Sequence, residues 1–430
     1  MSEALYEQRP LGDAVERHIG GGTPPRQVPS YWKGDIPWAS VKDFPEQKGV
    51  IQDTEEHISS AGLHASASNL IPDKTPLVCT RMAVGRAALP FVPMAINQDV
   101  KALFPASGVS TEYLLKLMQY IQPLAEGRAV GSTVKGIRIQ DYLNIPVPLA
   151  PQEAQPVIAK ILDTLDTAIR ETEALIDKLK AVKQGLLHDL LTRGIDANGQ
   201  LRPPQSEAPQ LYKESPLGWI PGEWEICPLH QQADVIDPQP DHRTPKEQED
   251  GVPYVGIGDF DEHGRVRFSS CRRVVQGAFE KQRQRFKIED GDIIYGKIGT
   301  IGKPKRLVAG DYALTANVLL LKPKYSPALF FMLLTSAFEG QILDITNTTS
   351  QPALGIETVR NLLVYKVPRT ESDLISERLD SIFSQISEEI AMLHKLKQQK
   401  SGLMDDLLTG HVRVTPILAS VQRTAEPTGA

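Results

Sequence analysis

Twelve lysines and arginines lie between Gly264 and Arg306, against four acidic residues, so this stretch has an excess of eight positive charges. The whole chain of 430 residues has a formal net charge of −6. Clustered cations bind DNA phosphates with release of counterions, and arginines that reach the major groove can read guanine. A solvated charged face without a ligand is the alternative interpretation. From this stretch we predict DNA contacts by Lys297, Lys303, Lys305 and Arg306.

The first part of the chain carries fewer cations, and Tyr31, Trp32 and Trp38 lie near them in the sequence. A structural role is the alternative for each of these cations. The residues predicted to contact DNA in this part are Arg26, Arg81, Arg86 and Lys135.

Glycine-containing turns carry several of these side chains. The segment GKIGTIGK, from Gly296 to Lys303, could bring backbone amides close to a phosphate. Its counterpart TRMAVGR, which starts at Thr80, is one residue shorter, so we expect the two turns to be used differently. Neither matches the phosphate-binding motif G-x-x-x-x-G-K-[ST], and the chain has no glycine-rich S-adenosylmethionine loop and no Asn-Pro-Pro-aromatic tetrapeptide. We therefore predict no catalytic, metal-binding or cofactor-binding residue in this chain.

A nuclease is the enzyme alternative, because Pro72-Asp73 followed by Asp99-Val100-Lys101 fits the loose PD…(D/E)xK pattern. In that pattern two carboxylates hold a metal ion and a lysine assists hydrolysis. The matching segment later in the chain reads Asn317-Val318-Leu319 and lacks both charges. The three cysteines, Cys79, Cys227 and Cys271, have no C-x-x-C spacing, so we expect buried or idle thiols.

The sequence of the elements expected to position these residues occurs twice in the chain. The phrase KLKAVKQGLLHDLLT at Lys178–Thr192 recurs as KLKQQKSGLMDDLLT at Lys395–Thr409, 217 positions later. Apolar residues at steps of three and four precede each phrase, which predicts two long helices that pack against each other as a coiled coil. Lys183 and Lys400 interrupt the apolar stripe. They either extend to solvent, or fix the register of the helices, or face a docked partner. The predicted seam and partner-binding residues are Leu165, Ile169, Leu179, Leu186, Leu190, Ile382, Ile386, Leu396, Leu403 and Leu407.

A sequence segment with a pattern typical of strands and turns precedes each predicted helix. The segments of the two halves also resemble each other. IPWASVKDF at Ile36–Phe44 resembles VPYVGIGDF at Val252–Phe260. We predict an α+β fold: two mixed α/β heads separated by two long antiparallel coiled-coil helices, related by an internal pseudo-two-fold repeat. The predicted segments are a first head at 1–150, a central spacer helix at 151–194, a linker at 195–213, a second head at 214–368, a distal spacer helix at 369–414 and a flexible tail at 415–430.

No apolar run approaches the roughly 20 residues of a membrane span, and the first residues lack the charged-then-apolar order of a signal peptide. We therefore expect a cytoplasmic protein with no membrane partner.

Particular phrases carry a family resemblance. The opening GGTPPRQVPSYWKGDIPWASVKDF from Gly20, the lead-in ESPLGWIPGEWEICPL from Glu214 and the paired K-x-G-L-[LM]-x-D-L-L-T phrases resemble the DNA-specificity subunit of type I restriction-modification enzymes. The resemblance covers the chain except its tail.

The resemblance implies two target-recognition domains that read a bipartite, asymmetric sequence in double-stranded DNA. It also implies a helical spacer on which two modification (methyltransferase) subunits dock, with restriction subunits joining in the full complex. The chain itself would not be an enzyme, and S-adenosylmethionine, ATP and Mg would act in the partner subunits. A coiled-coil adaptor without a DNA role is the second alternative; it explains the helices but assigns no purpose to the heads or the basic stretch.

Overall fold

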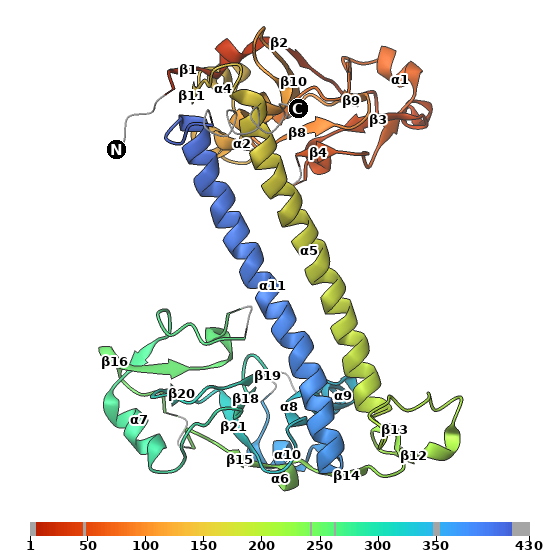
Figure 1. The fold of residues 1–430 in the computed structure, drawn as a ribbon, viewed down its shortest axis with the longest axis vertical. Coiled ribbons are helices and arrows are strands. Elements are labelled where there is room, and N and C mark those ends of the chain that lie inside the picture. Colours follow the sequence, from red (N-terminus) through yellow and green to blue (C-terminus); the bar gives the residue numbers. More distant parts are fainter. Residues whose placement is uncertain (1–5, 46–48, 241–242, 262–263, 347–352, 415–430) are drawn as a thin grey trace, which may run out of the picture. The chain divides into compact units, whose positions relative to one another are not determined.

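The computed structural model describes residues 6–45, 49–240, 243–261, 264–346 and 353–414. The chain divides into two compact units (Figure 1), and we call Met1–Thr172 with Leu393–Ala430 the first unit and Glu173–Met392 the second unit. Two long helices, α5 (Gln155–Thr192) and α11 (Arg369–Thr409), each contribute residues to both units. Among the described residues, no helix is both long enough and apolar enough to span a membrane.

The first unit is built on a five-stranded sheet in the order β2-β10-β7-β8-β4. Its strands pair antiparallel except β4 and β8, which are parallel. A four-stranded sheet has the order β5-β3-β9-β6, and β1 pairs with β11. The strands are β1 (Gln8–Pro10), β2 (Val15–Gly20), β3 (Ile36–Ala39), β4 (Val50–Ile51), β5 (His57–Ile58), β6 (Leu70–Ile71), β7 (Leu77–Cys79), β8 (Ala87–Pro90), β9 (Met94–Ile96), β10 (Val100–Pro105) and β11 (Pro146–Pro148).

Strand β7 is buried on both faces, because successive side chains of a strand point to opposite sides. Leu77 and Cys79 pack into a core that also contains Ile96 of β9, whereas Val78 packs into a core with α2 and α5. The Ser110 hydroxyl caps α2 by accepting a hydrogen bond from Tyr113 N. The shorter helices of this unit are α1 (Ser60–His64), α2 (Thr111–Tyr120), α3 (Gln122–Arg128) and α4 (Ile139–Leu143).

The second unit contains a four-stranded sheet in the order β15-β21-β18-β19 and a three-stranded sheet in the order β17-β16-β20. Strand β14 pairs with β22, and β12 pairs with β13. The strands are β12 (Tyr212–Ser215), β13 (Gly218–Pro221), β14 (Glu225–Pro228), β15 (Ala233–Ile236), β16 (Glu247–Val255), β17 (Arg273–Val274), β18 (Ile293–Gly296), β19 (Gly302–Arg306), β20 (Ala313–Leu314), β21 (Val318–Pro323) and β22 (Leu363–Lys366). The shorter helices are α6 (Leu229–Gln232), α7 (Gln276–Arg283), α8 (Leu329–Met332), α9 (Ser336–Thr346) and α10 (Ile356–Asn361).

The strand orders show that one topology occurs twice. The order β2-β10-β7-β8 of the first unit returns as β15-β21-β18-β19 in the second unit. The parallel pair β3–β9 returns as β16–β20, and the antiparallel pair β1–β11 returns as β14–β22. The predicted fold class, with two mixed α/β parts, long helices and an internal repeat, is confirmed.

Within the second unit, α5 and α11 run antiparallel. The Lys183 ammonium lies 5.0 Å from the centre of the Phe383 ring. Further along, Ile195 N, just beyond the end of α5, donates to Glu371 Oε1 near the start of α11, at 2.7 Å. As the residue number rises along one helix it falls along the other, so the directions are opposite.

The residues of the predicted seam on the two long helices differ in burial. Five of them are buried and five are half-buried. The buried ones are Ile169, Leu190, Ile382, Ile386 and Leu407, and the half-buried ones are Leu165, Leu179, Leu186, Leu396 and Leu403.

The segment predicted as a linker, 195–213, contains tertiary structure. Ile195 bridges to Leu201, and Arg202 is 7% exposed. The Arg202 guanidinium pairs with Glu371 at 2.5 Å and with Glu223 at 2.7 Å. Its polar and proline-rich composition indicated a linker; in the structure the ion pair with Glu371 joins it to α11, and the pair with Glu223 joins it to the segment between β13 and β14.

Candidate nucleic-acid interface

A hairpin turn joins β7 to β8 in the first unit and runs from Thr80 to Arg86. Two backbone hydrogen bonds close it: Gly85 N donates to Cys79 O at 2.9 Å, and Arg86 N donates to Ala83 O at 3.1 Å. The backbone of the turn is therefore well defined, although the turn lies outside both strands.

A second segment of the chain, 130–137, fastens this hairpin from the side. Met82 N donates to Lys135 O, and Ile137 N donates to Thr80 O, both at 2.9 Å. Three of the cations predicted to contact DNA in the first unit, Arg81, Arg86 and Lys135, are thus gathered by tertiary contacts from two separate parts of the sequence.

The matching hairpin of the second unit joins β18 to β19: its turn is residues 297–301, and Gly302 and Lys303 are the first two residues of β19. Leu354 N donates to Lys297 O at 2.9 Å, which corresponds to the Ile137–Thr80 contact of the first unit. Gly296 pairs with Val318 as Cys79 pairs with Val100.

Between the paired strands the first turn spans residues 80–86 and the second spans 297–301, so the prediction that the first is one residue shorter is wrong: it is the longer of the two. Both hairpins have left-handed backbone at the third and sixth residues after the preceding strand: Met82 (φ 64°) and Gly85 (φ 80°) in the first, Gly299 (φ 74°) and Gly302 (φ 77°) in the second. Cys79 occupies the strand position in the first unit that Gly296 occupies in the second unit.

Each hairpin contains one residue with a Cβ atom in the left-handed region: Met82 in the first and Lys303 (φ 53°) in the second. Such a conformation costs roughly 1–2 kcal/mol for a residue other than glycine. Both side chains are exposed. Residues held in this conformation are enriched at functional sites, so the two hairpins are the centre of the candidate interface.

The structure distributes the predicted cations of the second unit over different environments. Lys303 is exposed and makes no ion pair within the described part of the chain. Lys297 is 3% exposed, and its ammonium lies 2.6 Å from Asp237 Oδ2, a contact that indicates a structural role. Lys305 is half-buried, 5.9 Å from the Phe260 ring.

Arg306 is directed toward α11 and the core. Its guanidinium forms an ion pair with Asp380 and lies 4.4 Å from the centre of the Phe330 ring. These contacts favour a role in joining the second head to the spacer helix, although they do not test its predicted contact with DNA.

In the first unit, Arg26 is engaged with its own protein surface. Its Nη2 donates to Glu56 Oε2 at 2.9 Å, and its guanidinium lies 3.7 Å from the Trp32 ring centre. Hydrogen bonding to Arg26 holds the pKa of the Glu56 carboxyl below its usual value. The arginine is half-exposed, so its outer edge remains open to solvent.

The cations at the first hairpin are more open. Arg81 is 55% exposed and lies 3.3 Å from Asp99 Oδ1, and Lys135 is exposed. Arg86 donates to Phe44 O at 3.3 Å and is half-buried. Arg81 and Lys135 are therefore the more available of the three for a phosphate.

The remaining cations of the basic stretch lie on the surface of the second unit. Some are partly neutralised: Arg265 pairs with Asp261 at 3.3 Å, and Arg272 pairs with Glu247 at 3.2 Å. The exposed basic residues are Arg265, Arg267, Arg272, Arg273, Lys281, Arg283, Arg285 and Lys287.

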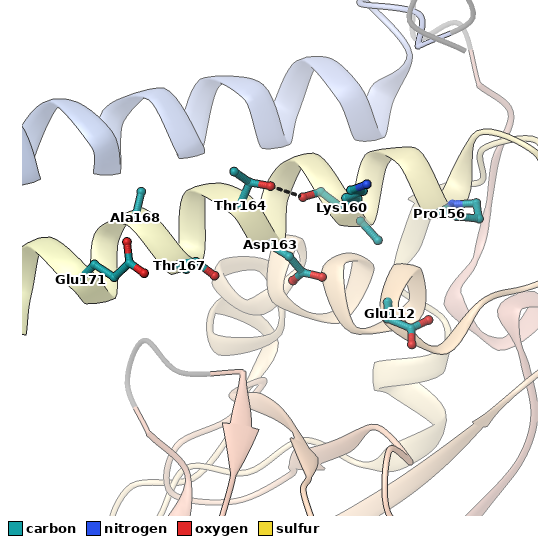
Figure 2. Close-up of a pocket in the computed structure, with 9 residues that line it drawn as sticks. Glu112, Pro156, Lys160, Asp163, Thr164, Thr167, Ala168 and Glu171 are labelled. Carbon is teal, nitrogen blue, oxygen red and sulfur yellow. Dashed lines mark hydrogen bonds between the residues drawn. The ribbon is translucent and has the colours of Figure 1, made fainter. Parts of the chain in front are cut away.

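A cleft of about 540 Å³ runs along α5 in the first unit (Figure 2). Carboxylates of Glu112 from α2 and of Asp163 and Glu171 from α5 line it. Small side chains, among them Thr164 and Ala168, form much of the rest of its wall. Lys160 also lines it, but carboxylates predominate and repel phosphates, so we do not include this cleft in the candidate nucleic-acid interface.

The residues of the nuclease pattern have other contacts. Asp99 lies beside Arg81, and the Lys101 ammonium donates to Gln98 O at 3.1 Å. Within the described part of the chain, the group of side chains with metal-ligand spacing is Asp405, Asp406 and His411, which does not include them. The nuclease alternative gains no support.

All three cysteines are buried. Burial raises the pKa of the Cys271 thiol to about 11 and also raises the pKa values of Cys79 and Cys227. At neutral pH these side chains are thiols packed in the core, in line with the expected idle role.

Comparisons with known proteins agree on one family. Residues 4–181 match the family described as the type I restriction modification DNA specificity domain. The MjaIX type I restriction enzyme specificity subunit of Methanocaldococcus jannaschii is 22% identical over 420 residues, which cover 92% of this chain and 91% of that protein. The MjaVIII specificity subunit of the same organism is 24% identical over 312 residues, 70% of each chain.

Among solved structures, the S subunit of a type I restriction-modification system from M. genitalium matches with a TM-score of 0.61. The match covers 95% of this chain and 97% of that chain at 14% identity. At this identity the likeness establishes the fold alone, and it extends over both units.

Proposed function

We propose that this chain is a specificity subunit of the type I restriction-modification family and that it directs its partner subunits to a bipartite, asymmetric DNA sequence. It performs no catalysis itself. In this proposal the first head, predicted at 1–150, reads one block of bases, and the second head, predicted at 214–368, reads the other.

One observation carries the proposal: the hairpin after β7 in the first head and the hairpin after β18 in the second share left-handed backbone at matching positions but carry different side chains. Thr80, Arg81 and Met82 stand where Lys297, Ile298 and Gly299 stand in the second copy. The two hairpins lie at matching places in the strand orders, and their unlike side chains present different donors and apolar groups to base edges. Two such heads are suited to two different half-sites, which makes the combined site asymmetric.

The strained cation at the second hairpin supports contact with the DNA backbone. Lys303 is held in a left-handed conformation with its side chain exposed and without an ion pair among the described residues. A lysine at a fixed turn can neutralise a phosphate without first breaking an internal contact. Lys297 and Arg306 would have to break such contacts, so we assign them lower importance for DNA.

The partners follow from the proposed family membership. We propose that two modification subunits dock on the paired helices, and that restriction subunits join in the full complex. S-adenosylmethionine, ATP and Mg would act in those subunits, and the complex would work in the cytoplasm, where its DNA is. Carboxylates predominate in the cleft along α5 (Figure 2), which favours a protein partner over DNA at that surface.

Single-molecule sequencing of methylated bases tests the proposal directly. DNA from cells that carry this chain with its neighbouring modification gene would be compared with DNA from cells that lack this chain. We expect methylation at a split motif, two short specific blocks around an unspecific gap, only when the chain is present. Unchanged methylation despite an intact complex would refute the proposal and favour the adaptor interpretation.

A further inference from the structure

Met82 occupies the position in the first hairpin that Gly299 occupies in the second, with φ values of 64° and 74°. A residue with a Cβ atom is disfavoured in this region, whereas glycine adopts it freely. The Met82 side chain is also 65% exposed, so the fold gains little apolar burial from it. A strained and exposed apolar residue is unfavourable for folding on both counts, which indicates a contact with something outside the chain.

The turn presents this side chain from a fixed backbone. Met82 N donates to Lys135 O, and Ala83 N donates to Arg81 O, both at 2.9 Å. Two residues further on, Val84 is 2% exposed and anchors the turn in the core of the first unit. The methionine therefore projects from a turn that is held from two sides, which lowers the entropy cost of a contact.

The surroundings of Met82 combine cations with apolar groups. Arg81 is 55% exposed and Lys135 is exposed. On the fastening segment, Val130 and Val134 are 76% and 43% exposed. Cations beside a small apolar tip match duplex DNA, in which phosphates border base edges and steps that accept apolar side chains.

We propose that Met82 makes an apolar contact with base pairs in the block that the first head reads, while Arg81 and Lys135 contact the neighbouring phosphates. This inference rests on the proposed function. Two kinds of contact with base pairs suit the apolar Met82 side chain. It could pack its thioether chain on a thymine methyl group in the major groove, or it could insert between two base pairs as a wedge.

The test uses the full chain in complex with its modification subunits. The DNA is a set of duplexes that carry the split motif identified by methylation sequencing. Binding would be measured for the motif and for every single-base change in both blocks, with wild type, Met82→Gly and Met392→Ala. Glycine suits the left-handed position, so Met82→Gly is expected to fold normally, which a thermal unfolding scan checks. Met392 lies on α11 in the second unit, is 49% exposed and serves as the control.

We expect Met82→Gly to bind the motif about tenfold more weakly, the effect of losing one base contact. Discrimination should be lost at one or two adjacent positions of one block and kept throughout the other, and Met392→Ala should keep both. Full affinity and discrimination in Met82→Gly would overturn the inference. If Met82→Gly no longer bound the modification subunits but still discriminated between DNA sequences, the inference would also be overturned. Met82 would then be assigned to a contact with a protein partner.

Two further substrates separate the two base contacts. If Met82 packs on a thymine methyl group, uracil in place of that thymine should weaken binding by wild type and not by Met82→Gly. If Met82 is a wedge, 2-aminopurine at the affected step should brighten with wild type and not with Met82→Gly, because unstacking relieves its quenching. If the wild-type complex methylates no split motif, the proposed function itself fails, whatever Met82→Gly does.

Discussion

Lys400 forms an ion pair with Asp166, with its Nζ 2.5 Å from Oδ1, where the two long helices meet in the first unit. The 217-residue offset between the two copies of the repeat places Lys183 at the position of Lys400 and Phe383 at that of Asp166, and Lys183 lies over the Phe383 ring. The same helix pairing is therefore polar in one unit and a cation–π contact in the other. Lys183 and Lys400 are directed into the helix interface, which favours the register interpretation over extension to solvent.

Asp166 is expected to stabilise the first unit, because its Oδ2 also lies 2.7 Å from the Nζ of the buried Lys116 and forms an ion pair with it. Asp166→Ala leaves Lys116 with Asp163 alone and leaves Lys400 unpaired. Breaking fully buried pairs costs about 3–5 kcal/mol, and we expect about 2–3 kcal/mol for this change because Asp166 keeps some exposure to water. Urea unfolding measures the loss of stability.

The control for this loss is Asp177→Ala, which removes an exposed pair with Lys180 at 3.9 Å. Exposed pairs contribute about 0–1 kcal/mol, so its unfolding free energy should hardly change. Equal effects of the two substitutions would mean that burial of Lys116 does not matter.

Lys303 and Lys297 should separate DNA binding from folding. Lys303→Ala is expected to weaken DNA binding and to lower the slope of log affinity against log salt by about 1, the value for one lost phosphate contact. Lys297→Ala is expected to destabilise the second unit, because Asp237 loses its buried partner. Fluorescence anisotropy of a labelled duplex over a salt series, together with unfolding curves, measures both effects. A stability loss in Lys303→Ala and a reduced salt slope in Lys297→Ala would show that the two roles are reversed.

Arg306→Ala should act mainly through the junction between the second head and α11. It removes the ion pair with Asp380 and the contact with the Phe330 ring. We expect a lower unfolding temperature with an unchanged salt slope for DNA binding. A reduced salt slope in a variant of normal stability would instead support the direct phosphate contact predicted from the sequence.

The half-buried seam leucines should matter for every target site. Leu186 and Leu403 pack against the cores of the second and the first unit. Leu186→Asp or Leu403→Asp places a charge in these contacts, and we expect loss of methylation at all sites together with lower stability. Leu175→Asp, at a position 41% exposed on α5, is the control, and methylation sequencing of cells carrying each variant gives the result.

Tyr120 predicts a change of stability at high pH. Its hydroxyl donates to Asp405 Oδ1 at 2.9 Å, and burial with this carboxylate raises its pKa to about 12. The unfolded side chain ionises near pH 10, so the fold favours the neutral phenol. Its contribution to stability is complete below pH 10 and is lost as the pH rises from about 10 to 12.

Wild type should therefore lose more stability between pH 9 and pH 11 than Tyr120→Phe, as measured by urea unfolding at each pH. Tyr325→Phe, at a position 66% exposed, should behave as wild type does. Parallel loss in all three proteins would show that Tyr120 does not contribute.

The repeat, the long helices and their seam could be predicted because they depend on local periodicity. Leu190 and Leu407 are buried where the three-and-four spacing predicted, since a helix sets side-chain direction from residue to residue. The repeated phrases also predicted that the two halves share one topology, and the strand orders agree.

The availability of each cation depended on contacts between residues far apart in the chain. The charge of the basic stretch predicted DNA contacts for Lys297, Lys303 and Arg306 alike. In the folded chain, however, Lys297 forms an ion pair with Asp237 and Arg306 forms one with Asp380. The composition of a segment records its own charges but not the distant carboxylates that neutralise them. The matching strand positions of the two hairpins and the strained backbone of Met82 likewise became visible only with the strand register and the dihedral angles, because both depend on pairing across the sheet.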